Sequence, residues 1–477
     1  MTASGQRRRR TSFLLLVVMV IAILTGSAGG VFGLYGGLGV TGMVVLAAVL
    51  WVRQNELAAI LVIAVSLCVD WYLGLHLVAI TIAMVLLLNF WFTRSVQHPW
   101  IELPMWGLWV LFLVLGVYPA VQGALTLYDA ASYYPNDVLG ALLMFWLGTL
   151  LARDIDCVRR FFVLFAGFSA LIALHTSIQG LTGTIVFASP HYDALFLANS
   201  SYQLAGTDTH RAGSFFVDPN WNGTFLATAL FLPLGLFAEC STLAKKVLYL
   251  AAIFMLLLAL LFTYSNGAIL SVAFGLLPFL GLVGHLRYRI LLPLLAGGAM
   301  MAAFVLFSSQ LASLALHASN PSELSLRLGA WKTALQVISA FPLTGVGLGY
   351  EAYLERANPY RVPEQFVPLS HPHNSYLEWG AKAGIPVLVV FLVLLLYALW
   401  LAWRNWALSN AHTRSLLGGG LTAILTLSIN SWSINGWTLP VLSLVGWLLL
   451  GVISSPLLRK SLRSEAIHEE KPGILNE

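Results

Sequence analysis

Long apolar runs separated by short polar segments constrain the fold of this chain more than any other feature. A helix needs about 20 apolar residues to cross the hydrocarbon core of a bilayer. With 59% hydrophobic residues and a mean hydropathy of +0.83, the 477-residue chain has far more apolar surface than a soluble core can bury. The pattern predicts an all-α, polytopic transmembrane helical bundle of about 12–14 spans. We expect these helices near residues 12–33, 36–52, 57–73, 75–93, 104–122, 137–152, 160–180, 220–240, 246–263, 266–284, 290–308, 376–403, 415–432 and 437–456.

Basic residues fall in short clusters between the apolar runs, so we interpret them as topology signals and expect no nucleic-acid partner. If both termini are cytoplasmic, 19 of the 25 Lys and Arg residues lie on the inner side. The remaining six fall in or beside segments 181–219 and 309–375, which are the longest that lack an apolar run: Arg211, Arg327, Lys332, Arg356, Arg361 and Lys382. We therefore expect both segments to face outward, with amphipathic helices in the larger one.

This topology predicts a multi-pass protein of the cytoplasmic (inner) membrane, with any active site on the extracytoplasmic side. Residues 1–460 are expected to form a single integral-membrane domain in which the two outer segments build the site. The short charged stretch 461–477 is expected to be a disordered cytoplasmic tail.

Residues 371–382 hold the densest group of polar side chains in a chain that is only 9% charged. This stretch lies where the larger outer segment returns to the membrane, and polar groups near hydrocarbon cost free energy unless they are hydrogen-bonded or hydrated. We interpret it as a functional site with His373 as the working residue and His371 as the alternative. Three neighbours are candidates for substrate binding: Asn374, Tyr376 and Lys382.

Arg211 lies just before a helix that is expected to begin near Asn220. Asp218 is a suitable helix cap, and Pro219 fits the first turn. The start of a helix presents free backbone amides to an anion. The outward basic residues are suited to an anionic ligand, so Arg211, Asp218 and Asn220 are candidate site residues, although Asn220 fits a plain helix start equally well.

Arg327 belongs to an amphipathic helix that is expected to start at residues 320–323. Its apolar stripe is formed by Leu324, Leu328, Trp331, Leu335 and Ile338. At about 100° per residue, Arg327 falls about 40° from Trp331. We expect the helix to lie on the outer leaflet and to direct the guanidinium toward the lipid phosphates. Lys332, on the same helix, is a further candidate for substrate binding.

The order of these residues carries a resemblance. Arg211 is followed by Arg327 and then by His373-Asn374, with nine residues before Gly384-Ile385-Pro386-Val387. In this order, over roughly residues 205–400, the chain resembles the bacterial O-antigen ligase and polysaccharide polymerase family. The resemblance implies a metal-independent membrane glycosyltransferase with no cofactor. It would move a glycan from an undecaprenyl-diphosphate-linked donor to a saccharide or lipid-linked acceptor on the outer face.

The resemblance also assigns roles. Arg211 and Arg327 would hold the diphosphate, and His373 would assist the acceptor hydroxyl. These roles agree with the chemistry of the side chains, because guanidiniums bind phosphates at two points without titrating. A neutral imidazole, with an ordinary pKa near 6.5, accepts a proton at external pH.

Two other functions are open from the sequence. The same cations suit a transporter or flippase for an anionic or lipid-linked substrate. Asp70 is the main charged residue within an apolar run, and we find no inverted repeat, which makes a route across the bilayer the weaker hypothesis. A structural scaffold would have no need of the outward arginines and histidines.

Overall fold

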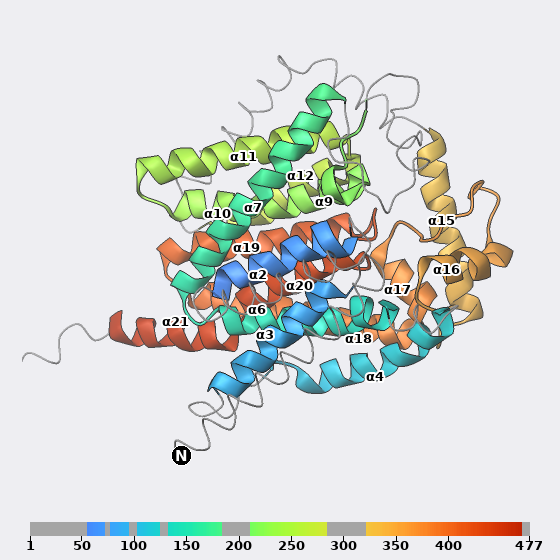
Figure 1. Ribbon diagram of the computed structural model, residues 1–477, viewed down its shortest axis with the longest axis horizontal. Coiled ribbons are helices and arrows are strands. Elements are labelled where there is room, and N and C mark those ends of the chain that lie inside the picture. The colour runs from blue at the N-terminus through green and yellow to red at the C-terminus, as the bar shows by residue number, and fades with distance from the viewer. Residues whose placement is uncertain are drawn as a thin grey trace, which may run out of the picture.

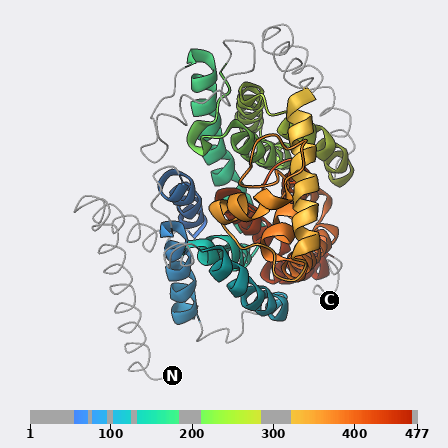
Figure 2. The ribbon, with the colours of Figure 1, turned by 90° about the vertical axis from the view of Figure 1, so that its right-hand side faces the viewer.

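The structure, a computed structural model, describes residues 55–71, 77–94, 103–124, 132–183, 210–283 and 321–469. These residues form a helical bundle in which α6, α10, α19 and α20 run side by side, with α15 lying across one end (Figure 1). Seen from that end, α15 lies over the bundle (Figure 2). The helix α21 lies at the opposite end (Figure 1). The two ends are called here the α15 end and the α21 end.

The first half of the described chain supplies helices on both sides of the bundle. Their bounds are α2 Asn55–Val65, η1 Ser66–Trp71, α3 Val78–Arg94, α4 Trp106–Gly123, η2 Tyr134–Leu139, α6 Gly140–Leu151, α7 Ile155–Thr182, η4 Ser214–Phe216, α9 Pro219–Ala229, α10 Phe231–Glu239, α11 Leu243–Thr263 and α12 Asn266–Leu282. The second half gives α15 Pro321–Ala340, α16 Tyr350–Ala357, η5 Asn358–Tyr360, α17 Ser375–Ala383, α18 Ile385–Leu408, α19 Ala411–Asn430, α20 Pro440–Ser454 and α21 Pro456–Glu469.

Several of these helices are long and apolar enough to cross a bilayer. Within the described residues there are six: Trp106–Gly123, Ile155–Thr182, Pro219–Glu239, Leu243–Thr263, Ile385–Leu408 and Pro440–Glu465. They confirm the predicted polytopic helical bundle. Three expected spans, 12–33, 36–52 and 290–308, lie outside the described residues, so the total number of spans stays a prediction. The central member is α9 with α10, which is buried along almost its whole length.

Aromatic side chains fill the centre of the bundle near the α15 end. Trp447 of α20 contacts Trp109 of α4, with ring centroids 5.1 Å apart, and Trp437, with centroids 5.3 Å apart. Phe391 of α18 stacks on Trp379 of α17 at 5.5 Å. Interlocked rings of this kind bury large areas and hold defined relative orientations. The short helix α17 is thereby fixed against the membrane-spanning helices.

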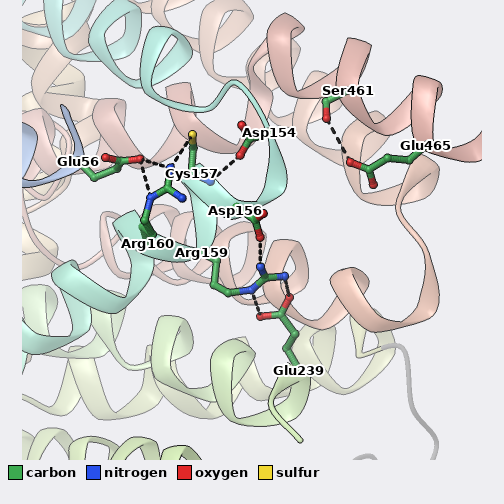
Figure 3. A network of polar contacts seen from close by, with 9 residues as sticks. All are labelled: Glu56, Asp154, Asp156, Cys157, Arg159, Arg160, Glu239, Ser461 and Glu465. Atoms are coloured by element: carbon green, nitrogen blue, oxygen red, sulfur yellow. Dashed lines mark hydrogen bonds and ion pairs between the residues drawn. The ribbon is translucent and has the colours of Figure 1, made fainter. Parts of the chain in front are cut away.

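Ion pairs join helices at the α21 end (Figure 3). Arg159 of α7 donates two hydrogen bonds to Glu239, the last residue of α10, at 3.1 and 2.7 Å, and also pairs with Asp156. Arg160 pairs with Glu56 of α2 at 2.9 Å. The basic residues of this end that the sequence assigns to the inner side therefore balance acidic partners. These bonds fix the start of α7 against two neighbouring helices.

Two boundaries differ from the expectation. The predicted span 376–403 is two helices, because Gly384 between α17 and α18 has φ +86° and any Cβ there would lie 2.4 Å from the carbonyl oxygen of Leu343. Apolar periodicity continues through this break and does not reveal it. At the other end, α21 extends to Glu469, so residues 461–469 are helical where a disordered tail was expected.

Candidate functional site

Arg211 lies at the α15 end, beside the first turn of the central helix. Its side chain is only 7% exposed. Nε donates to the carbonyl oxygen of Thr263 at 3.0 Å, and Nη2 donates to Oδ1 of Asn220 at 2.6 Å. The backbone amide of Ala212 adds a bond to the carbonyl of Phe262 at 2.9 Å. The end of α11 and the start of α9 thus hold this guanidinium in one orientation.

Asp218 caps α9 as the sequence predicts. Its Oδ1 accepts from the backbone amides of Asn220 at 2.6 Å and Trp221 at 3.4 Å, and Pro219 occupies the first turn. Burial raises the pKa of Asp218, and the positive charges of Arg211 and Arg327 oppose that rise. Both guanidiniums therefore lie within electrostatic range of one carboxylate, although 116 positions separate them in the sequence.

Backbone strain marks the segment that carries Arg211 to this position. Ser214 has φ 51° and Val217 has φ 65°, and both are non-glycine residues in the left-handed region. A β-branched residue such as Val217 rarely adopts that conformation. Such strain persists only where the surroundings impose it, which is common at functional sites.

Arg327 approaches from α15, which starts at Pro321 as the sequence predicts. Nη1 donates to the carbonyl oxygen of Ser433 at 3.2 Å. The expected orientation toward lipid phosphates is therefore wrong. The stripe that packs on the protein consists of the buried Ala330, Ala334 and Val337, which share a helix face with Arg327, whereas the leucines of the predicted stripe are exposed. Small residues allow α15 to approach α17 closely and bring the guanidinium over the bundle.

His371 and His373 form a pair at the same end. Their ring centroids are 4.3 Å apart, and Tyr350 packs edge-on against His371 at 5.7 Å. Asn374 is the cap of α17, since its Oδ1 accepts from the amides of Tyr376 at 3.0 Å and Leu377 at 3.1 Å. His373 therefore lies one residue before the cap, with φ 52°.

Two ring nitrogens of this pair are enclosed without a hydrogen-bond partner among the described residues: Nε2 of His371 and Nδ1 of His373. An enclosed polar atom without a partner costs free energy unless a water or ligand contacts it. A hydroxyl group could bond these atoms only if the side chains that enclose them moved aside.

Both imidazoles are neutral at ordinary pH. Burial, assisted by the charges of Lys382 and Arg327, lowers the pKa of His371 to about 3. Burial, His371 and Arg327 hold the pKa of His373 well below its ordinary value of 6.5. The charge of Arg327 thus affects the pKa values of both histidines and of Asp218.

The segment 431–439, named here the connector, links α19 to α20 and joins these elements. Its Ser431 carbonyl accepts from the amide of Ser375 at 2.9 Å. Asn435 bonds Trp221 and Tyr350, and Ser433 accepts from Arg327. The expected spans 415–432 and 437–456 leave only residues 433–436 between them, and no site residue was predicted there. The signal was present as a run of polar residues and tryptophans between apolar segments.

Of the remaining predicted site residues, Lys382 lies near the histidines, whereas the polar groups of Lys332 and Tyr376 bond other partners. Lys382 is 5% exposed, pairs with Glu378 at 2.5 Å and lies 4.3 Å from the centroid of the Tyr350 ring, close to the histidines. Lys332 is exposed and pairs with Glu364 at 2.5 Å, about 140° around α15 from Arg327. Tyr376 directs its hydroxyl to the carbonyl of Ser428 at 2.8 Å, toward α19.

The lowered histidine pKa values predict an unusual pH dependence. Activity that needs neutral imidazole is expected to stay level from about pH 8 down to about pH 5.5, whereas an ordinary histidine would lose half of its activity near pH 6.5. An initial-rate profile on purified protein measures this. A fall centred near pH 6.5 would contradict the burial of the pair.

Folding stability should follow the same linkage. Below about pH 6.5 the histidines bind protons in the unfolded chain but stay neutral in the folded protein. Their contribution to the free energy of unfolding is therefore full above that pH and decreases as the pH falls toward the pKa values of the folded state. The expected slope is at most about 1.4 kcal/mol per pH unit for each histidine. His371→Gln should remove one such contribution from the melting profile.

The fold and this end of the bundle define a class: a polytopic helical membrane protein with two arginines and two neutral histidines at one end. Residues 251–392 match the protein family described as O-antigen ligase. The match confirms the family that the sequence resembles. It includes Arg327 and His373, whereas Arg211 and the connector lie outside it. No curated protein matches the chain.

Proposed function

We propose that the protein transfers a glycan from an undecaprenyl-diphosphate-linked donor to a sugar hydroxyl on the outer face of the cytoplasmic membrane. The observation that carries this proposal is the position of Arg327. Its guanidinium donates to the carbonyl of Ser433 in the connector, and Asn435 of the same connector bonds Trp221 and Tyr350. Its charge also helps to lower the pKa values of His371 and His373. A donor diphosphate at the arginines would therefore present its sugar toward the histidines.

The chemistry balances with these groups alone. The acceptor oxygen attacks the anomeric carbon, and the bond between that carbon and the diphosphate oxygen breaks with its electron pair leaving on the diphosphate. Arg211 and Arg327 stabilise the charge that develops there. His373 takes the proton of the acceptor hydroxyl as a neutral base. Its low pKa makes it a weak base, so its contribution depends on close positioning.

The transporter alternative has less support. Asp70, the main charged residue within an apolar run, accepts backbone hydrogen bonds from Val78 at 2.9 Å and Ala79 at 2.8 Å. It thereby satisfies the free amides at the start of α3 and serves as a structural anchor. This structural role accounts for a carboxylate within an apolar run, so no transport path is needed to explain it.

One incubation tests the proposal. Purified protein in lipid is mixed with a defined undecaprenyl diphosphate oligosaccharide, with and without a saccharide or lipid-linked acceptor. A ligase joins the oligosaccharide to the added acceptor, a polymerase lengthens the donor glycan by itself, and a transporter makes no glycosidic bond. Absence of product with every acceptor would reject the proposed transfer.

Turnover is expected to survive removal of divalent metals. Two guanidiniums supply the charge stabilisation that a metal ion provides in other transferases. The measurement compares initial rates in excess EDTA with rates in added magnesium or manganese. A loss of activity with EDTA that either metal restores would show that the arginines are insufficient.

A further inference from the structure

Asn435 lies at the centre of the connector and is completely buried. Its Oδ1 accepts from the indole Nε1 of Trp221 at 2.7 Å, and its Nδ2 donates to the hydroxyl of Tyr350 at 3.2 Å. An indole nitrogen only donates, so the amide has one possible orientation between these two partners. The carbonyl of Asn435 also accepts from the amides of Thr438 at 3.1 Å and Leu439 at 2.7 Å, which holds the turn in place.

Each partner of Asn435 belongs to a different half of the site. Trp221 follows Asn220, whose side chain accepts from Arg211. Tyr350 packs on His371, which packs on His373. The two bonds join parts of the chain that are distant in sequence: Trp221 is 214 positions from Asn435, and Tyr350 is 85 positions from it. One amide thus joins the arginine half to the histidine half.

We infer that Asn435 is a positioning residue that sets the distance and orientation between the diphosphate-binding arginines and the histidine base. This inference rests on the proposed transferase function. A misplacement of about 1 Å between reacting groups can reduce a rate about 100-fold. Because the base is weak, the reaction is sensitive to that distance. A buried amide that is hydrogen-bonded on both sides restricts this distance to a smaller range than apolar contacts do.

A double-mutant cycle on the two partners tests the inference without removing Asn435 itself. Trp221→Phe removes the indole donor and keeps a ring. Tyr350→Phe removes only the hydroxyl and keeps the ring that faces His371 and Lys382. Each variant is expected to lower kcat about 5- to 50-fold with the donor KM unchanged, because binding groups stay in place while the alignment loosens.

The double variant is expected to lose no more than about 50-fold, like the single variants. Once one bond is gone the amide can rotate, so loss of the second bond adds little. Losses that multiply would show that the two bonds act independently and would overturn the inference. A loss confined to the donor KM, with kcat unchanged, would also overturn it.

Matched controls separate positioning from stability. Trp437→Phe removes an indole donor from the same connector, where Nε1 bonds Oγ of Ser428 at 3.3 Å. Tyr134→Phe removes a hydroxyl that donates to the carbonyl of Leu113 at 3.0 Å. Both controls should lower the melting temperature about as much as the test variants and change kcat less than about twofold. Equal kcat losses in the controls would reduce Asn435 to a structural role.

The same experiment separates failure of the proposed function from failure of the positioning role of Asn435. If the wild-type protein forms no glycosidic bond, the proposed function fails and the positioning inference fails with it. If the wild-type protein forms product but the two losses multiply, only the positioning inference fails.

Discussion

Replacing His373 with alanine is expected to reduce the rate of glycan transfer about 10²–10⁴-fold while donor binding stays nearly intact. The neutral imidazole is the proposed proton acceptor, so removing it slows the chemical step. Among the described residues it makes no hydrogen bond to Arg211 or Arg327, so both arginines keep their positions. Single-turnover rates on a defined donor, with donor affinity measured in parallel, give the two quantities separately.

His373 has φ 52°, so alanine at this position keeps the strain. His373→Asn provides a second test, because asparagine tolerates the left-handed region and takes up no proton near neutral pH. His412→Ala is the matched control, since His412 is exposed in the first turn of α19, at the end of that helix farthest from the connector. Near wild-type rates in both His373 variants would transfer the role of base to His371.

Local features of the site could be predicted from the sequence. Asp218 and Pro219 form a cap and a first turn because the preference of each residue acts over three or four neighbours. The start of α15 at Pro321 follows from the same kind of signal. Helix existence was also predictable, since long apolar runs near a bilayer have few alternatives to a helix.

The orientation of helix faces and side chains, and the contacts between distant parts of the chain, could not be predicted in the same way. The leucine stripe of α15 was expected to lie on the outer leaflet with Arg327 at its border. Arg327 instead shares a helix face with the buried Ala330 and Ala334 and donates to the carbonyl of Ser433. In a protein that adjoins lipid, apolar character does not distinguish the core from the membrane, and close helix contact favours small residues. The orientation of Arg327 was wrong for this reason.

The connector shows the second limit. The bond from Asn435 to Trp221 crosses 214 positions and the bond to Tyr350 crosses 85, so neither leaves a local pattern in the sequence. The lowered pKa values of the histidines depend on burial by these distant elements, whereas the sequence alone predicts an ordinary pKa near 6.5 and therefore a different pH profile.

Arg211→Lys is expected to lower the transfer rate at least about 10²-fold and to weaken donor binding as well. Lysine keeps the charge but not the planar fork. The bonds from Nε to Thr263 and from Nη2 to Asn220 come from different sides of the guanidinium, and an ammonium group cannot reproduce both. Thr263 is completely buried, so its carbonyl would be left buried and unpaired if lysine bonded only Asn220.

Arg414→Lys is the matched control for this change. Arg414 also uses two guanidinium nitrogens, donating to the carbonyls of Ser409 at 3.0 Å and Ala407 at 3.4 Å, but it belongs to the first turn of α19 at the far end of the bundle. Its lysine variant should bind the donor and turn over like the wild-type protein. If Arg211→Lys kept donor affinity and lost only rate, the diphosphate would be held elsewhere and Arg211 would act on the developing charge alone. If it kept both, the guanidinium would be a structural clamp between α11 and α9, and Arg327 would remain as the anion-binding group beside the histidines.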